Sequence, residues 1–151
     1  MNREILFRGK DLETGKWVYG YFTYCASRYD DPEKDRVADI IPVNTDRIYT
    51  GEYNCHEVYE VDINTVGQFT GLVDKNGTKI FEGDIIKCVT FGFSPDVFVT
   101  EVKFGPKSGA LGFYLANGRN MFYFGQSDLT KMDDSRVIGN IHDNPELLER
   151  K

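Results

Sequence analysis

Glu82 and Asp84 are two carboxylates that flank Gly83 just ahead of an apolar run. Side chains of this type and spacing could bind a metal ion or exchange protons with a substrate. The simpler interpretation of Asp84 is structural, because Asp side chains accept backbone N–H bonds in turns. A small enzyme would need at least two of Glu82, Asp84 and His142 to converge in one pocket. No third ligand lies near the pair in the sequence, so we favour the structural role.

Cys55, His56 and Glu57 form the densest group of side chains that can bind a metal, and His142 with Asp143 is the other histidine site. Neither group has a zinc-site spacing such as C-x-x-C or H-x-x-x-H. Neighbouring residues of a strand also point to opposite faces, which separates the Cys55 and His56 side chains. The chain has no G-x-S-x-G motif and no phosphate-binding loop. We therefore expect no metal, no cofactor and no catalytic residues.

Aromatic side chains make up 14% of the chain and are the better candidates for contact with a partner. Neighbours in the run Phe122–Phe124 must face opposite ways in a strand, so one side of this run cannot lie in a single barrel core. Core packing or contact between subunits is the commonest use of such rings. Stacking on nucleic-acid bases, with basic side chains between the rings, is a second use, and a small ligand is a third. The candidate contact residues are Phe91, Phe93, Phe98, Phe122 and Tyr123, with Lys87, Lys103 and Arg119 as the basic side chains.

The net charge of −6 is unevenly spread over the 151 residues. Residues 1–62 carry eight basic and thirteen acidic side chains, whereas residues 63–143 carry eight basic and nine acidic ones. An acidic chain lacks the charge expected of a general nucleic-acid binder, although the second region leaves room for a local basic patch.

The three cysteines, Cys25, Cys55 and Cys88, are too few and too widely spaced for a disulfide framework. Cys88 alternates with apolar residues and is expected to be a packed thiol. No apolar run approaches the ~20 residues that span a bilayer, and no signal-peptide pattern follows Met1. We expect a cytoplasmic protein that does not enter a membrane.

The first part of the chain is expected to form short strands. These are Ile5–Gly9, Lys16–Cys25, Asp39–Val43 and Glu57–Val61, with an exposed charged loop over Ser27–Arg36.

Alternation is cleaner after Phe69. Asn76-Gly77 predicts a hairpin with a type I′ turn, and Asn117-Gly118 predicts a second one. The strands expected here are Ile85–Phe91, Val97–Phe104, Ala110–Ala116, Arg119–Phe124 and Arg136–Ile141, with one helical turn over Ser127–Met132. Asn144 followed by Pro145 is typical of the start of a helix, which would be short. Strands at this spacing indicate an all-β barrel or sandwich.

Three segments resemble the YopX family of phage and prophage proteins. They are Gln68–Ile86, Val137–Leu148, and Phe7–Lys10 followed by Gly15–Gly20. The resemblance implies a small SH3-like β-barrel over residues 63–143, packed N-terminal strands in residues 1–62 and a helical tail in residues 144–151. It also implies oligomers and no known activity. The family's signature positions are interpreted as residues that form turns, cap helices or close the fold. They are Gly71, Asn76, Gly77, Gly83, Asp84, Gly139, Asn140 and Pro145.

Three hypotheses about function follow. The leading one is a phage or prophage protein that is not an enzyme, forms homo-oligomers and acts in the bacterial host through contacts with a protein partner that the sequence does not identify. The alternative is a small barrel that binds nucleic acid. The third is a small enzyme built on Glu82, Asp84 or His142.

Overall fold

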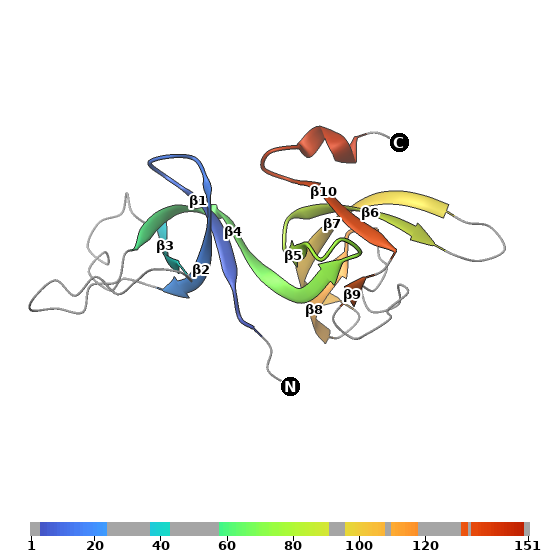
Figure 1. The fold of residues 1–151 in the computed structure, drawn as a ribbon, viewed down its shortest axis with the longest axis horizontal. Coiled ribbons are helices and arrows are strands. Elements are labelled where there is room, and N and C mark those ends of the chain that lie inside the picture. Colours follow the sequence, from blue (N-terminus) through green and yellow to red (C-terminus); the bar gives the residue numbers. More distant parts are fainter. Residues whose placement is uncertain are drawn as a thin grey trace, which may run out of the picture. The chain divides into compact units, whose positions relative to one another are not determined.

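The computed structural model describes residues 4–23, 37–42, 58–90, 96–107, 110–117, 131–132 and 134–149. Contacts within the chain divide it into two compact units, one from Glu4 to Gln68 and one from Phe69 onward. The domain boundary expected between residues 62 and 63 lies N-terminal to the observed one, and both boundaries fall inside a single strand, β4 (Tyr59–Asp74). Both units are built of β-strands (Figure 1).

The N-terminal unit consists of β1 (Phe7–Asp11), β2 (Trp17–Thr23), β3 (Val37–Pro42) and the first part of β4. Every pairing among them is antiparallel: β1 with β2, β2 with β3, β3 with β4, and β1 with β4. On β2, Trp17 pairs with Lys10 of β1, and the Arg8 guanidinium lies 4.6 Å from the centre of the Trp17 ring.

The core of this unit is small. Ile40 and Val61 are fully buried, and the partly buried side chains packed against them are Phe7, Val18, Tyr59 and Val66. Gly9 lies so close to Val61 that an added Cβ would come within 2.8 Å of its Cγ2 atom. β1 can therefore pack this closely against β4 because residue 9 is a glycine, since a larger residue would overlap Val61.

The C-terminal unit contains the rest of β4 and two groups of strands. A four-stranded antiparallel sheet has the order β10-β6-β7-β8, where the strands are β6 (Asp84–Thr90), β7 (Asp96–Lys107), β8 (Ala110–Leu115) and β10 (Ser135–Asn140). The end of β4 pairs with β5 (Lys79–Phe81) and, in parallel, with the two-residue β9 (Lys131–Met132).

The core of the C-terminal unit lies between these two groups of strands. Its six buried members come from five strands: Leu72, Ile80, Ile86, Cys88, Val102 and Leu115. Cys88 is a fully buried thiol within this cluster, which confirms its expected packing role. Full burial of one aliphatic side chain contributes about 1.5–3 kcal/mol, so this cluster is the main source of stability in the unit.

The all-β class is confirmed, but the strand pairings of the described residues form two sheets and do not close into one barrel across residues 63–143. The strand expected to end at Val61 instead continues as β4 to Asp74. Of the expected helical turn over Ser127–Met132, the last two residues form β9 instead. The predicted loop Ser27–Arg36 and strand Arg119–Phe124 lie outside the described residues.

An aspartate holds the hairpin turn after β4. The Asp74 carboxylate is buried, and its Oδ1 accepts the backbone N–H groups of Asn76 (2.8 Å) and Thr78 (2.9 Å). The Gly77 N–H donates to the Asp74 carbonyl, and Gly77 has a φ of +84°. This is a three-residue loop ending in a left-handed glycine, not the two-residue type I′ turn expected from Asn76-Gly77. The side chain of Asp74 competes for the N–H groups of the turn and so sets its length.

A second aspartate holds the turn after β1. Asp11 accepts the backbone N–H groups of Glu13 and Thr14 and the Thr14 hydroxyl, and Gly15 follows with a φ of +68°. The hydrogen bond from the Thr14 side chain is the main reason that the pKa of Asp11 lies below its usual value.

The chain leaves β10 through a close contact at Gly139. A Cβ on Gly139 would come within 2.6 Å of Asn144 Oδ1 and 2.9 Å of Leu147 Cδ1. Pro145–Leu148 then forms a single 3-10 turn, labelled η4, with no capping hydrogen bond from the Asn144 side chain. Among the described residues no helix is long and apolar enough to cross a membrane.

Candidate functional site

The β7–β8 hairpin presents two different surfaces, and both are candidates for contact with a partner. Because side chains alternate along a strand, one surface continues the core and the other faces away from it. The register fixes which residues share each surface: Val102 pairs with Leu115, Lys103 with Tyr114, Phe104 with Phe113, and Pro106 with Leu111.

The surface that continues the core becomes steadily more exposed along the hairpin. Val102 and Leu115 are fully buried, but Phe104 is 41% exposed and Leu111 is 70% exposed. The Phe104 and Phe113 rings contact each other with centroids 4.9 Å apart. We call Phe104, Pro106, Leu111 and Phe113 the apolar end of the hairpin.

The opposite surface of the same sheet carries basic side chains. Lys87 of β6 pairs with Arg136 of β10, and Lys103 of β7 pairs with Tyr114 of β8. Lys107 pairs with Ala110, and its ammonium lies 5.0 Å from the centre of the Tyr114 ring. We call Lys87, Lys103, Lys107, Tyr114 and Arg136 the basic face.

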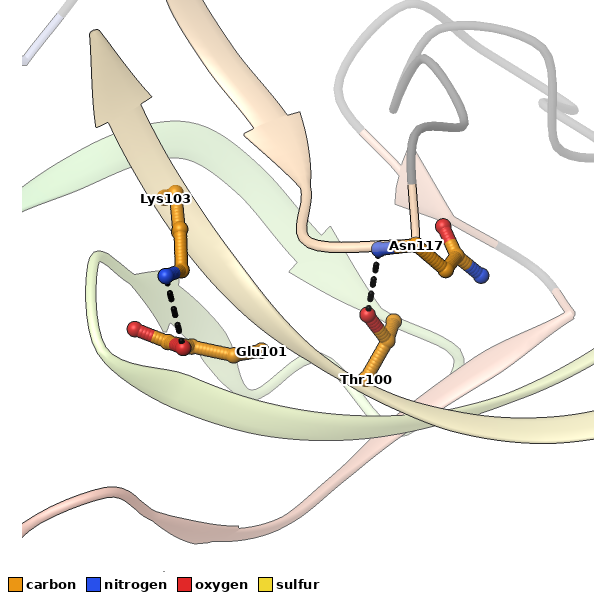
Figure 2. Close-up of polar contacts among 4 residues, drawn as sticks. All are labelled: Thr100, Glu101, Lys103 and Asn117. Atoms are coloured by element: carbon orange, nitrogen blue, oxygen red, sulfur yellow. Dashed lines mark hydrogen bonds and ion pairs between the residues drawn. The ribbon is translucent and has the colours of Figure 1, made fainter. Parts of the chain in front are cut away.

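Two contacts distinguish the two sides of β7 (Figure 2). Glu101 and Lys103 form an ion pair on the outer side, with Lys103 Nζ 3.3 Å from Glu101 Oε2. Thr100, which is buried on the core side, accepts the backbone N–H of Asn117 at 3.3 Å. The Thr100 bond fixes the end of β8 to the middle of β7, and the hairpin surfaces extend from this fixed point.

Of the eight contact residues expected from the sequence, three are described. Phe98 packs against the core cluster, whereas Lys87 and Lys103 both belong to the basic face. The other five lie outside the described residues: Phe91, Phe93, Arg119, Phe122 and Tyr123.

Asp84 and His142 lie near each other at the turn that Gly83 makes. Asp84 is buried, and its Oδ2 accepts the Phe81 N–H at 2.8 Å. His142 Nε2 lies 3.8 Å from where a Cβ of Gly83 would be, and the Ile141 N–H donates to the Gly83 carbonyl. Within the described residues no three His, Cys, Asp or Glu side chains are grouped so as to hold a metal ion. The Asp84 carboxylate thus braces a backbone turn.

Most of the other signature positions lie at turns and close contacts, and Gly77 and Gly83 both have positive φ. Gly71 does not lie at a turn: it is inside β4, where the register with β5 shifts between Phe69 and Val73, and its φ is +86°. Asn140 Oδ1 accepts the N–H groups of His142 and Asp143, and Pro145 begins η4.

Sequence reasoning missed the apolar end, Lys107, Tyr114 and Arg136. The expected strand Val97–Phe104 ends before Lys107, whereas β7 continues through it, so the shared face of Lys103 and Lys107 was not predicted. The pairing of Arg136 with Lys87 requires the register of two strands far apart in the chain, which no sequence signal provides.

Comparisons with known proteins agree on the extent of the fold. The family model described as "YopX protein" matches residues 6–149. The crystal structure of protein EF1440 from Enterococcus faecalis is similar over 97% of this chain and 99% of that one, with 25% sequence identity and a TM-score of 0.56. No curated protein matches.

Proposed function

This chain belongs to the YopX protein family, and on that premise we propose that it is a phage- or prophage-encoded accessory protein that acts in the bacterial cytoplasm without catalysing a reaction. It works through protein–protein contacts, including contacts with further copies of itself. The SH3-like arrangement of residues 63–143 that the family resemblance implies stays a prediction alongside this proposal.

The observation that carries the proposal is the apolar end of the β7–β8 hairpin. A soluble monomer gains nothing from extending two apolar rows of a hairpin beyond its own core, whereas a protein interface uses such a patch. Burying Leu111 and the exposed part of Phe104 would contribute a few kcal/mol, of the order of 1.5–3 for each fully covered side chain.

The register of the hairpin suggests how a second copy would bind. Phe104 pairs with Phe113 and Pro106 with Leu111, so the apolar end forms one patch. A two-fold axis can place the same patch of two copies face to face, and each apolar end would then be buried against the other.

Light scattering tests this proposal. At tens of micromolar the wild-type chain is expected to have a mass that is a multiple of 17.3 kDa, because the apolar ends are buried between copies. Leu111→Glu and Phe104→Glu place a charge in that interface and should give monomers.

Tyr21→Glu is the matched control, since Tyr21 is similarly exposed but lies on β2. A wild-type monomer at this concentration would remove self-association from the proposal. Capture of a host or phage protein that is lost in Leu111→Glu, but not in Tyr21→Glu, would still support contact with a protein partner.

A further inference from the structure

The basic face has an unusual arrangement of like charges. Arg136 and Lys87 are directly opposite each other on β10 and β6. Directly opposed side chains in an antiparallel pair have Cβ atoms about 4.5–5.5 Å apart, and like charges at this position destabilise the sheet. An anion bound between the two side chains would remove that repulsion.

A second observation on the same face concerns Lys107. Its Nζ atom is buried, and no described residue accepts a hydrogen bond from it. The ammonium lies 5.0 Å from the centre of the Tyr114 ring, an attraction that only partly replaces lost hydration. A buried ammonium that lacks an acceptor is costly unless a ligand supplies one.

The local charge of this face differs from that of the whole chain. Alternation places Lys87, Lys103, Lys107 and Arg136 on the outer side of the four-stranded sheet, and among the outward positions of its described strands Glu101 is the one acidic side chain. The η4 turn, which carries Glu146, packs on the same side at Gly139. The chain as a whole has a net charge of −6. On a protein with a net negative charge, a basic face attracts a polyanion at that face alone, because the acidic remainder of the surface repels it.

We propose that the basic face binds single-stranded nucleic acid. The four cations contact successive phosphates, and Lys107 moves from the Tyr114 ring to a phosphate oxygen. Tyr114 then offers its ring to an unpaired base, which a duplex does not expose. This surface is separate from the apolar end that supports the proposed function, so either one can fail without the other.

Glu101 limits this binding. Its carboxylate holds the Lys103 ammonium at 3.3 Å, as Figure 2 shows, and a phosphate must displace it. The proposal therefore makes a specific prediction: Glu101→Gln should strengthen binding by making Lys103 available.

Fluorescence anisotropy with a labelled oligothymidylate of ~15 nucleotides tests the proposal. Four phosphate contacts predict that log K falls with log[salt] with a slope of roughly −3, so affinity should drop about 50-fold between ~50 and ~200 mM salt. Lys107→Ala should reduce the slope by about 0.7. Arg136→Glu with Lys87→Glu should abolish binding, and a duplex of the same length should bind more weakly than the single strand.

Lys16→Glu is the matched control, because Lys16 is exposed in the turn after β1 and belongs to the N-terminal unit. Retained circular dichroism shows that each variant is folded. Undetectable or salt-insensitive binding of the wild type would overturn the proposal. So would equal loss in Lys16→Glu, tighter binding to the duplex, or weaker binding in Glu101→Gln. Full competition by polyglutamate would assign the face to an acidic protein instead.

Discussion

Asp11 and Asp74 stabilise two hairpin turns through similar local hydrogen bonds, but Asp74 also contacts a distant part of the chain. Each aspartate ends a strand and accepts backbone N–H groups of the next few residues, and each turn finishes with a glycine at positive φ. The hydrogen bonds that the Asp11 carboxylate accepts from described residues stay within its own turn. Asp74 also accepts the Val137 N–H on Oδ2 at 3.0 Å, from a residue 63 positions away.

The difference shows that one sequence pattern can serve either local or tertiary structure. An aspartate before a turn predicts the turn in both units. Whether its second oxygen is used locally or reaches another strand depends on what packs beside it. In the C-terminal unit that neighbour is β10, so Asp74 joins the β4–β5 hairpin to the four-stranded sheet.

Asp74→Asn is expected to have the largest effect of the changes that test this comparison. The substitution keeps the size of the side chain but turns one acceptor into a donor that faces a backbone N–H. The cost should be about 2–3 kcal/mol, as for hydrogen bonds to a buried charged group. Urea unfolding followed by circular dichroism measures it.

Asp11→Asn is the matched control and should shift the unfolding midpoint much less. Fluorescence of Trp17, the single tryptophan, reports on the N-terminal unit and should respond less to Asp74→Asn than circular dichroism does. Equal losses of unfolding free energy in Asp74→Asn and Asp11→Asn would contradict the view that Asp74 has a tertiary role that Asp11 lacks.

The two turn glycines are expected to behave alike. Gly15 and Gly77 have φ values of +68° and +84°, and nothing lies within 4 Å of a Cβ added at either one. Gly15→Ala and Gly77→Ala should therefore each cost about 1–2 kcal/mol, from backbone strain alone. Thermal unfolding of the two variants measures this. A much larger cost at Gly77 would mean that the tertiary link through Asp74 also constrains the loop backbone.

Thr14→Ala should give the smallest effect, seen mainly in acid. The Thr14 hydroxyl is the main cause of the lowered pKa of Asp11, so the variant should move that pKa up toward 3.8. Because the folded-state pKa is below the unfolded one, the stabilisation is present above about pH 4 and is lost as the pH falls through the lowered value. An NMR titration of the Asp11 carboxyl group measures the shift, and an unchanged pKa in Thr14→Ala would show that the backbone bonds alone set it.

Local sequence signals predicted the β class, a turn at Asn76-Gly77 and the buried Cys88, because each depends on alternation or on one residue type. They did not predict the type of that turn, which depends on the Asp74 side chain. They failed where distant segments decide the outcome. Val137 completes the Asp74 contacts, and β9 pairs with the end of β4, although neither relation has a local signal. Lys87 and Lys103 were recognised as candidates, but their partners on the basic face come from the register of β6 with β10 and from the tip of the β7–β8 hairpin.

The continuity of β4 has an evolutionary consequence. Its residues up to Gln68 pair with β1 and β3, and those after it pair with β5 and β9. Inserting or deleting one residue in a strand moves every later side chain to the opposite face. A connecting loop tolerates such changes, whereas a single length change between Phe69 and Asp74 would turn Leu72 away from its core cluster. Relatives should therefore keep the number of residues between Phe69 and Asp74 constant.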